Sequence, residues 1–423
     1  MRNLRERLQR LRPDTATPPK AITTDPGSLA ERLRRLDPAR RRAATTGATD
    51  EQALAERLGA EIVAPGVVRL QRRQPLNRRH GRFRAADCAG AMPAVFAEAS
   101  TDPAGWAVID TETSGLVGGT GTWAFTCGVG RIVGDRFSMQ QWLLTRLDSE
   151  AAMLALLADA LSDVDLLISY NGKSFDLPLL MTRFRLARPV RVPGEEAHGK
   201  PSPDICRRIE AIAHLDVLHP VRRAFASRWP DCRLANAEQR LLGFRRDDDL
   251  PGAEAPAVWL DWLRRGDGGR LGAVLRHNRL DLVSLVALVP ALAGVERDPI
   301  AHGVDLGAMA RHRLRQGDAD GALALLCSAQ PVLLLSERLL LASLYRRRGD
   351  WEQARAVWER LAADDQPDAL EALAKYHEHR SGDLRRALDL ARRLPAGLER
   401  DHRQLRLSRK LDADPANGLL PLS

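Results

Sequence analysis

An acidic tripeptide directly follows an apolar run that is typical of a buried β-strand. Trp106-Ala107-Val108-Ile109 leads into Asp110-Thr111-Glu112. Because side chains alternate along a strand, Asp110 and Glu112 point to the same side. Two carboxylates about 4 Å apart repel by roughly 4 kcal/mol at an effective dielectric constant near 20. The pair predicts a cation between them, and carboxylate oxygens suit Mg²⁺ or Mn²⁺. A strand that ends in a polar turn is the alternative, so the hypothesis depends on further acids.

Length and composition limit the class of protein. With 423 residues the chain exceeds what one hydrophobic core usually spans, so two or three domains are expected. The apolar content of 44% includes no uninterrupted apolar run of about 18 residues, and the N-terminus is charged, so we expect a cytoplasmic protein without a membrane span. Five widely spaced cysteines without a Cys-x-x-Cys pair predict reduced thiols. The net charge of +9 favours a polyanionic partner, such as nucleic acid.

The N-terminal part of the chain is strongly basic. Residues 1–42 hold twelve Lys or Arg against five acids and contain several prolines, which predicts a mostly disordered arm. A second cluster of basic residues surrounds His80 and Phe83 and would either bind phosphates or form a solvated surface. Its members are Arg72, Arg73, Arg78, Arg79, Arg82 and Arg84. We therefore assign residues 1–103 to a basic, partly disordered region.

Short strands and helices alternate from Trp106 onward. The pattern predicts strands at 106–110, 125–132, 136–144 and 166–170, a helix at 149–161, and turns at 118–121 and 171–172. This order indicates an α/β domain, residues 104–297, in which helices flank a mixed sheet.

A repeat marks the C-terminal third, where strand signals end. Gly-Asp pairs at Gly317-Asp318, Gly349-Asp350 and Gly382-Asp383 recur 32 and 33 residues apart, each before an Ala-rich helical stretch. A period of about 34 residues with paired helices resembles tetratricopeptide repeats. Residues 300–423 are therefore predicted to be an all-α helical-repeat domain, which either binds a protein partner or packs on its neighbour.

Asp176 is the third candidate acid. It follows the strand at 166–170 and the turn Asn171-Gly172, and Leu177-Pro178 opens the next helix. An Asp at this position can cap the helix, because Pro is well tolerated in a first turn. The same position also delivers a carboxylate to the C-terminal end of a strand, where open α/β sheets place their sites.

Asp281 is the fourth acid, and His277 lies four residues before it. The two share one face of a helix, while Leu282, Leu285 and Val286 form the neighbouring apolar face. An isolated His/Asp pair would be a surface hydrogen bond. Beside three other acids, it indicates a base next to a metal ligand.

The acids occur within a wider set of motifs that resembles a known family. Asp110-x-Glu112, Asp176, His277 and Asp281 are similar to the four-acid motifs of 3′→5′ exonucleases with the ribonuclease H-like fold, and the chain resembles the YprB-like predicted exonucleases most. The segments that carry this resemblance are 110–116 with 118–121, 170–176, 214–219, 241–248 and 277–281, in the expected order.

The resemblance implies a two-metal nuclease. Two Mg²⁺ or Mn²⁺ ions would be held by Asp110, Glu112, Asp176 and Asp281. His277 would be the base that takes the proton from the attacking water. The product would be a nucleoside 5′-monophosphate released from a 3′ end. In the histidine subclass of these enzymes the His precedes the last Asp by five residues, whereas here the spacing is four.

Four questions stay open at this stage. Lys173 either contacts a phosphate or faces solvent in its turn, and Asp216 is expected to support the site without binding metal. A nucleic-acid- or protein-binding adaptor on an inactive nuclease fold is the alternative function. The choice between DNA and RNA depends on pocket geometry.

Overall fold

The computed structural model describes residues 50–90, 102–115, 120–187 and 203–413. The chain divides into two compact units, Met1–Gly59 and Ala60–Ser423. The described part of the first unit is a helical segment at residues 50–58. The basic arm predicted for residues 1–42 lies outside the described residues, and so does part of the turn predicted at 118–121.

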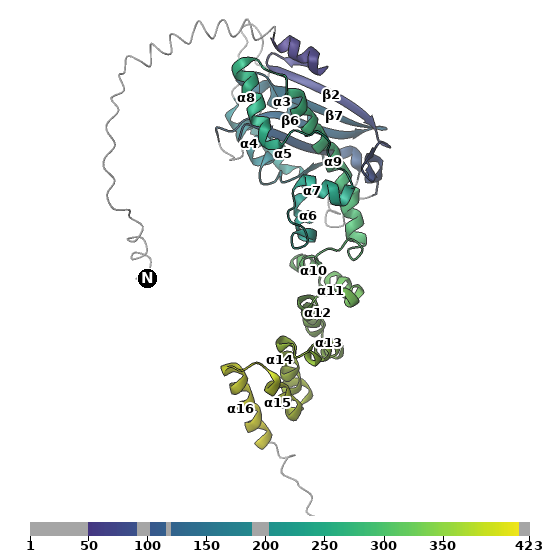
Figure 1. The fold of residues 1–423 in the computed structure, drawn as a ribbon, viewed down its shortest axis with the longest axis vertical. Coiled ribbons are helices and arrows are strands. Elements are labelled where there is room, and N and C mark those ends of the chain that lie inside the picture. The colour runs from purple at the N-terminus through teal and green to yellow at the C-terminus, as the bar shows by residue number, and fades with distance from the viewer. Residues whose placement is uncertain (1–49, 91–101, 116–119, 188–202, 414–423) are drawn as a thin grey trace, which may run out of the picture. The chain divides into compact units, whose positions relative to one another are not determined.

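A mixed sheet forms the centre of the second unit (Figure 1). Among the described residues it has seven strands in the order β1-β2-β7-β6-β5-β8-β9. β5 pairs in parallel with β8, and β8 with β9, whereas the other pairs are antiparallel. The strands are β1 (Glu61–Ala64), β2 (Val67–Pro75), β5 (Trp106–Thr113), β6 (Ala124–Val133), β7 (Arg136–Leu144), β8 (Leu166–Ser169) and β9 (Ala213–Asp216). A separate two-stranded ladder consists of β3 (Arg79–His80) and β4 (Phe83–Arg84).

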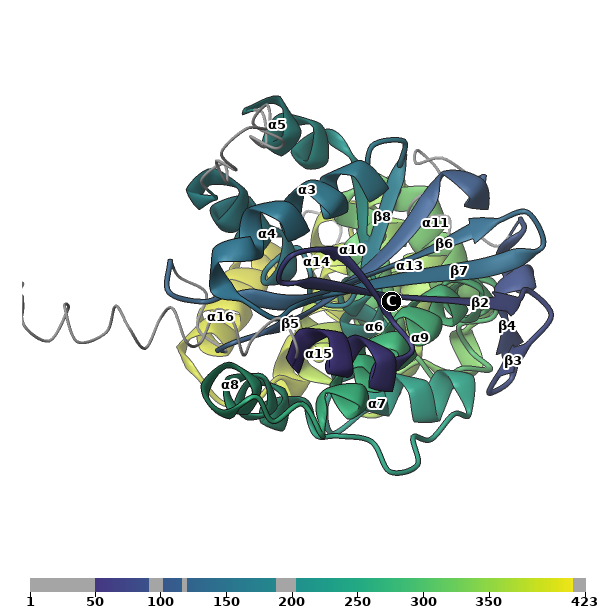
Figure 2. The same cartoon turned by 90° about the horizontal axis from the view of Figure 1, so that it is seen from above.

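Helices cover both faces of the sheet. They are α3 (Glu150–Ala160), α4 (Asp176–Leu186), α5 (Pro203–Ala211), α6 (Leu218–Phe225), α7 (Leu234–Ala237), α8 (Ala255–Arg265) and α9 (Leu271–Arg297), with a π-helical turn η5 (Glu238–Leu242) after α7. Figure 2 shows α3 and α4 on one side of the sheet and α8 on the other. The predicted mixed sheet flanked by helices is confirmed.

α9 is the core helix of this unit. Its length and apolar composition would suffice to cross a membrane, since its most apolar window has a mean hydropathy of 1.5. However, 83% of that window is buried inside the protein, where α9 packs on β5 and β6. A helix that is apolar all round is expected in the core of a large domain.

The sheet extends beyond the predicted start of the domain at residue 104. β2 pairs with β7 along its whole length, from Val67 opposite Leu144 to Pro75 opposite Arg136. β1 and β2 therefore belong to the sheet, although the sequence assigns them to the basic N-terminal region. The reason is that consecutive exposed residues, Gln71, Arg72 and Arg73, interrupt the apolar alternation by which a strand is recognised.

Only helices occur among the described residues after 300. They are α10 (Leu306–Arg315), α11 (Ala319–Ser328), α12 (Leu335–Arg348), α13 (Trp351–Ala363), α14 (Pro367–Tyr376), α15 (Leu384–Arg393) and α16 (Leu398–Asp412). Consecutive helices pack in pairs, which confirms an all-α C-terminal region. Their identity as tetratricopeptide repeats stays a prediction.

The repeated Gly-Asp pair is the turn between helices. Gly349 adopts φ 92° at the end of α12, a left-handed conformation that favours glycine, and Asp350 precedes α13. In the other two repeats the Asp caps the next helix: Asp318 accepts a hydrogen bond from the Gly321 amide, and Asp383 from the Arg386 amide. The period in the sequence therefore reflects the recurrence of helix ends.

All five cysteines are free thiols, as predicted. They lie in the described residues, and Cys88 and Cys127 are fully buried. Burial raises the pKa of the Cys88 thiol to about 12, so this side chain behaves as a small apolar group.

Candidate active site

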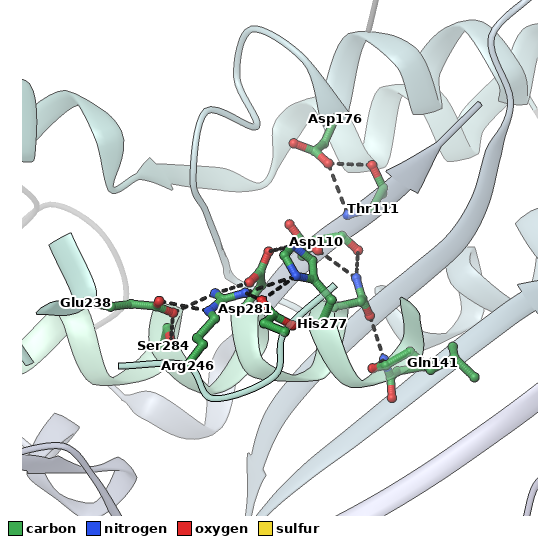
Figure 3. Close-up of polar contacts among 12 residues, drawn as sticks. Asp110, Thr111, Gln141, Asp176, Glu238, Arg246, His277, Asp281 and Ser284 are labelled. Atoms are coloured by element: carbon green, nitrogen blue, oxygen red, sulfur yellow. Dashed lines mark hydrogen bonds and ion pairs between the residues drawn. The ribbon is translucent and has the colours of Figure 1, made fainter. Parts of the chain in front are cut away.

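Strand β5 separates the candidate acids onto two sides of the sheet. Alternation directs Asp110 and Glu112 to one side and Thr111 to the other. Glu112 is buried and Asp110 is partly buried. Figure 3 shows Asp110 beside Asp281 and His277 of α9, with Thr111 turned toward Asp176. The strand end therefore connects two groups of acids.

Asn278 positions Asp110. It is fully buried on α9, and its Nδ2 donates to the Asp110 backbone oxygen at 3.1 Å and to Oδ2 at 2.7 Å. Gln141 Nε2 on β7 donates to Asn278 Oδ1 at 2.8 Å. A Cβ on Gly128, which pairs with Asp110 across β5 and β6, would lie 2.2 Å from Asn278 Oδ1. Glycine is therefore required for α9 to approach the sheet this closely.

Asp176 is anchored to β5 from the opposite side. It is the first residue of α4, and its Oδ1 accepts from Thr111 N at 3.2 Å and Thr111 Oγ1 at 2.5 Å. The N-cap residue of α4 is Phe175, whose side chain makes no capping hydrogen bond. Burial raises the pKa of Asp176 to about 6, and the two bonds from Thr111 oppose the shift. The structure thus ties Asp176 to the strand that carries Asp110 and Glu112.

Asp216 holds the loop that leads to Asp176. Its buried carboxylate accepts hydrogen bonds from the amides of Asn171 at 2.8 Å, Lys173 at 3.0 Å and Leu218 at 3.1 Å. Asn171 has φ 67°, so the turn departs from regular backbone where Asp216 binds it. The predicted supporting role of Asp216 has this geometric basis. The Lys173 side chain is exposed.

Replacing Asp216 with alanine is expected to lower the free energy of unfolding by about 3 kcal/mol, because the backbone amides of Asn171, Lys173 and Leu218 lose a buried charged acceptor. Chemical denaturation monitored by circular dichroism measures this value. Asp159→Ala is the matched control, because Asp159 is exposed on α3 and should change stability by less than about 0.5 kcal/mol. Equal stability of the two variants would show that Asp216 does not hold the loop.

Arg246 links the second group of acids. Its guanidinium donates to Glu238 at 2.6 Å and to Asp249 at 3.0 Å, and it also forms an ion pair with Asp281. Glu238 lies on η5, is 1% exposed, and also accepts from Ser284 of α9. A single guanidinium therefore holds three carboxylates from separate segments of the chain.

His277 has a carboxylate on each side of its ring. Nδ1 lies 2.7 Å from Asp249 Oδ2, and Nε2 lies 3.8 Å from Asp281 Oδ2. The 2.7 Å contact requires a proton between the two atoms, which places it on Nδ1 in the neutral ring. Arg246 Nη1 also approaches Nδ1, at 3.3 Å. A neutral His277 then presents an unprotonated Nε2 toward Asp281.

The acids raise one another's pKa. Burial raises the pKa of Asp110 well above its usual range, and Asp281, Glu112 and Asp176 raise it further, whereas the bond from Asn278 opposes the shift. Burial also raises the pKa of Glu112, followed by the charges of Asp281 and Asp176. For Asp281, burial raises the pKa and Arg246 opposes it. All four predicted acids are therefore close enough to interact electrostatically.

This donor set fits hard divalent cations. Buried carboxylates that repel one another are stabilised by a positive ion, and oxygen is the ligand that Mg²⁺ and Mn²⁺ prefer. In the part of the chain that the structure describes, no three His, Cys, Asp or Glu side chains stand close enough together to hold a metal ion as they lie. Asp281 forms an ion pair with Arg246, and Asp176 accepts hydrogen bonds from Thr111. Metal binding would therefore require these side chains to turn.

Sequence reasoning missed several partners of the predicted acids. Arg246 lies inside the motif at 241–248, and Asn278 lies inside the motif at 277–281, but neither was assigned a role. Asp249, the next residue after the first of these motifs, was not singled out. The sequence gives little indication of its role, because Asp249 is the last of three consecutive aspartates, Asp247 to Asp249. Only the fold shows that Asp249 is the one that contacts His277.

Comparisons with known proteins agree with this geometry. Residues 107–293 match the model of the RNase_H superfamily. The chain is also 32% identical over 295 residues to the uncharacterized protein YprB of Bacillus subtilis (strain 168). That match covers 67% of this chain and 67% of YprB.

Proposed function

This chain belongs to the family of YprB and carries a ribonuclease H superfamily domain, and on this basis we propose that it is a metal-dependent 3′→5′ exonuclease. A domain of this superfamily is consistent with a nucleic-acid hydrolase. The direction of hydrolysis, the two-metal mechanism and the roles of individual residues are parts of the proposal.

The observation that carries the proposal is the electrostatic cluster at the end of β5. The negative charges of three carboxylates, Asp110, Glu112 and Asp281, lie close enough to repel. His277 lies beside Asp281 on α9. A cluster of this kind costs folding free energy, because each charge raises the pKa of its neighbours, and such clusters are enriched at functional sites. Asp281 is paired with Arg246, whereas neither Asp110 nor Glu112 forms an ion pair with a basic side chain among the described residues.

Each residue has a role in the proposed reaction. Asp110, Glu112, Asp176 and Asp281 would hold two divalent ions, which when bound supply an activated water and stabilise the leaving oxygen. His277 Nε2 accepts the proton of the attacking water, and Asp249 orients the ring through Nδ1. Asn278 orients Asp110, and Arg246 sets the position of Asp281.

An adaptor that binds nucleic acid or protein without hydrolysis is the alternative function. The helices α10–α16 would then carry the useful binding surface, and we propose that they bind a protein partner in either case. The presence of all four acids favours the enzyme, since an adaptor gains nothing from mutually repelling carboxylates.

The deciding experiment is hydrolysis of 5′-labelled DNA and RNA oligonucleotides in Mg²⁺, in Mn²⁺ and in excess chelator. We expect a ladder of products that shorten from the 3′ end in at least one metal and none in chelator. An oligonucleotide with a blocked 3′ end is the matched control and should resist. Internal cuts or shortening from the 5′ end would contradict the proposed polarity, and no hydrolysis of any substrate would favour the adaptor.

A further inference from the structure

A basic cleft lies between α6 and α10, outside the candidate active site. It has a volume of about 480 Å³. Six basic side chains line it: His219, Arg222, Arg223, Arg311, His312 and Arg315. Figure 1 shows α6 between the sheet and α10, so the cleft lies where the nuclease-like domain meets the helical region.

Hydrogen bonds fix the two walls of the cleft to each other. The amide of Asp305 donates to the Ala224 carbonyl oxygen of α6 at 2.8 Å, and Ser227 Oγ donates to Asp305 Oδ2 at 2.7 Å. Asp305 also caps α10 by accepting from the Ala308 amide at 2.7 Å. The cleft is therefore preformed, which reduces the conformational entropy that a ligand must lose on binding.

The positive charge of the cleft is poorly compensated. Asp305 is its one acidic lining residue, and this carboxylate is shared among the Ser227 hydroxyl, the Ala308 amide and Arg311, whose guanidinium lies 3.9 Å away. Arg222 and Arg315 form no ion pair with any residue that the structure describes. Burial lowers the pKa of Arg223, and Arg315 lowers it further, while Glu296 opposes the shift. Cations that repel one another in a concave site favour a polyanionic ligand.

One end of the cleft adjoins the loop that carries Asp176. His219 Nε2 lies 3.8 Å from Asp216 Oδ2, and Asp216 in turn binds the amides of Asn171 and Lys173. α6 begins directly after β9, at the C-terminal ends of the parallel strands, where open α/β sheets place their sites. A chain of phosphates that leaves the acid cluster past this loop would therefore meet the arginines next.

We propose that this cleft binds backbone phosphates of a single nucleic-acid strand upstream of the 3′ end that is hydrolysed. The proposal rests on the proposed exonuclease function and extends it to the path of the substrate. A positively charged groove that follows the backbone is the usual device for binding single strands without sequence preference. Substrates long enough to reach the cleft should bind more tightly than short ones.

The test compares two double variants of the full chain with the same change in net charge. Arg222→Ala with Arg315→Ala removes two arginines from the cleft, whereas Arg347→Ala with Arg409→Ala removes two exposed arginines from α12 and α16. Fluorescence anisotropy in chelator measures binding of a labelled strand of roughly 20 nucleotides, longer than the site sizes of typical single-strand grooves. Because binding is measured without turnover, the result does not depend on hydrolysis.

For the cleft variant we expect binding on the order of tenfold weaker at low salt. The slope of the logarithm of the binding constant against the logarithm of the salt concentration should be less steep by about 1.4, or about 0.7 for each lost phosphate contact. The control variant should bind as the wild type does. If both variants lose the same affinity, only net charge matters and the cleft proposal is wrong. If labelled poly-glutamate binds the cleft as tightly as the nucleic acid, the ligand is an acidic protein and the proposal is overturned.

Hydrolysis of a dinucleotide separates this proposal from the proposed function. The cleft variant should hydrolyse a dinucleotide without a 5′-phosphate at the wild-type rate, because this substrate has no backbone phosphate upstream of the bond that is hydrolysed. A wild type that binds the long strand through the cleft but hydrolyses nothing would contradict the exonuclease and leave the binding site in place. A wild type that hydrolyses both substrates while the cleft variant binds them normally would contradict the cleft alone.

Discussion

Asp110→Asn is expected to remove nearly all hydrolysis, with a fall in rate of at least about 10³-fold. Asp110 would hold metal, and an amide is a weaker ligand than a carboxylate for a hard cation. The substitution keeps the shape of the side chain and can still accept the hydrogen bond from Asn278. Initial rates on a 5′-labelled oligonucleotide measure the loss. A wild-type rate in this variant would remove Asp110 from the mechanism.

The same variant should be more stable than the wild type in chelator at neutral pH. The pKa of Asp110 is raised by burial and by Asp281, Glu112 and Asp176, so folding favours its protonated form. Its contribution to stability is therefore present below the ordinary carboxyl pKa and is lost as pH rises through the raised pKa. Asp176, with a pKa of about 6, also contributes stability that is lost as pH rises, between about pH 4 and 6.

Thermal unfolding in chelator across this pH range tests the sign of the effect. We expect the midpoint of the wild type to fall as pH rises from about 4, and the fall to be smaller in Asp110→Asn. Divalent metal should raise the midpoint of the wild type more than that of the variant, because it binds the folded state. A variant that is less stable at every pH would contradict the predicted relief of repulsion at Asp110.

His277→Ala is expected to lower the rate about 10²- to 10⁴-fold, the usual contribution of a general base. The ring is held by Asp249 at Nδ1 and stands 3.8 Å from Asp281 at Nε2, so its removal leaves no other histidine in contact with the acids of the cluster among the described residues. Rates at saturating substrate separate this loss from a loss of binding. An unchanged rate would exclude His277 as the base.

Asp249→Asn distinguishes a base from a structural histidine. His277 stays in place in this variant, but its Nδ1 faces an amide instead of a carboxylate, which weakens the preference for the tautomer with a free Nε2. The expected loss is about 10- to 100-fold, with a change in the pH dependence of the rate. A loss equal to that of His277→Ala together with lower stability would indicate that Asp249 mainly supports the fold.

Local pattern was sufficient to predict the central strands and the repeated turns. β7 has the predicted bounds, and β5, β6 and β8 differ from the prediction by a few residues at their ends, because apolar runs between turn residues determine them. β1 and β2 were missed, since the exposed arginines of β2 resemble a solvated basic segment. Charge pattern alone does not distinguish a surface strand from an irregular chain.

The sequence by itself determined which residues share a face: Asp110 with Glu112 by strand alternation, and His277 with Asp281 by helical spacing. Only the tertiary structure decided what each of them contacts. Asn278 reaches Asp110 across 168 positions of the chain, because Gly128 lets α9 lie close to the sheet. The ion pair between Arg246 and Asp281 likewise arises from packing between distant segments, and so does the basic cleft between α6 and α10. Local periodicity carries no information about such contacts, since they depend on which elements the hydrophobic core brings together.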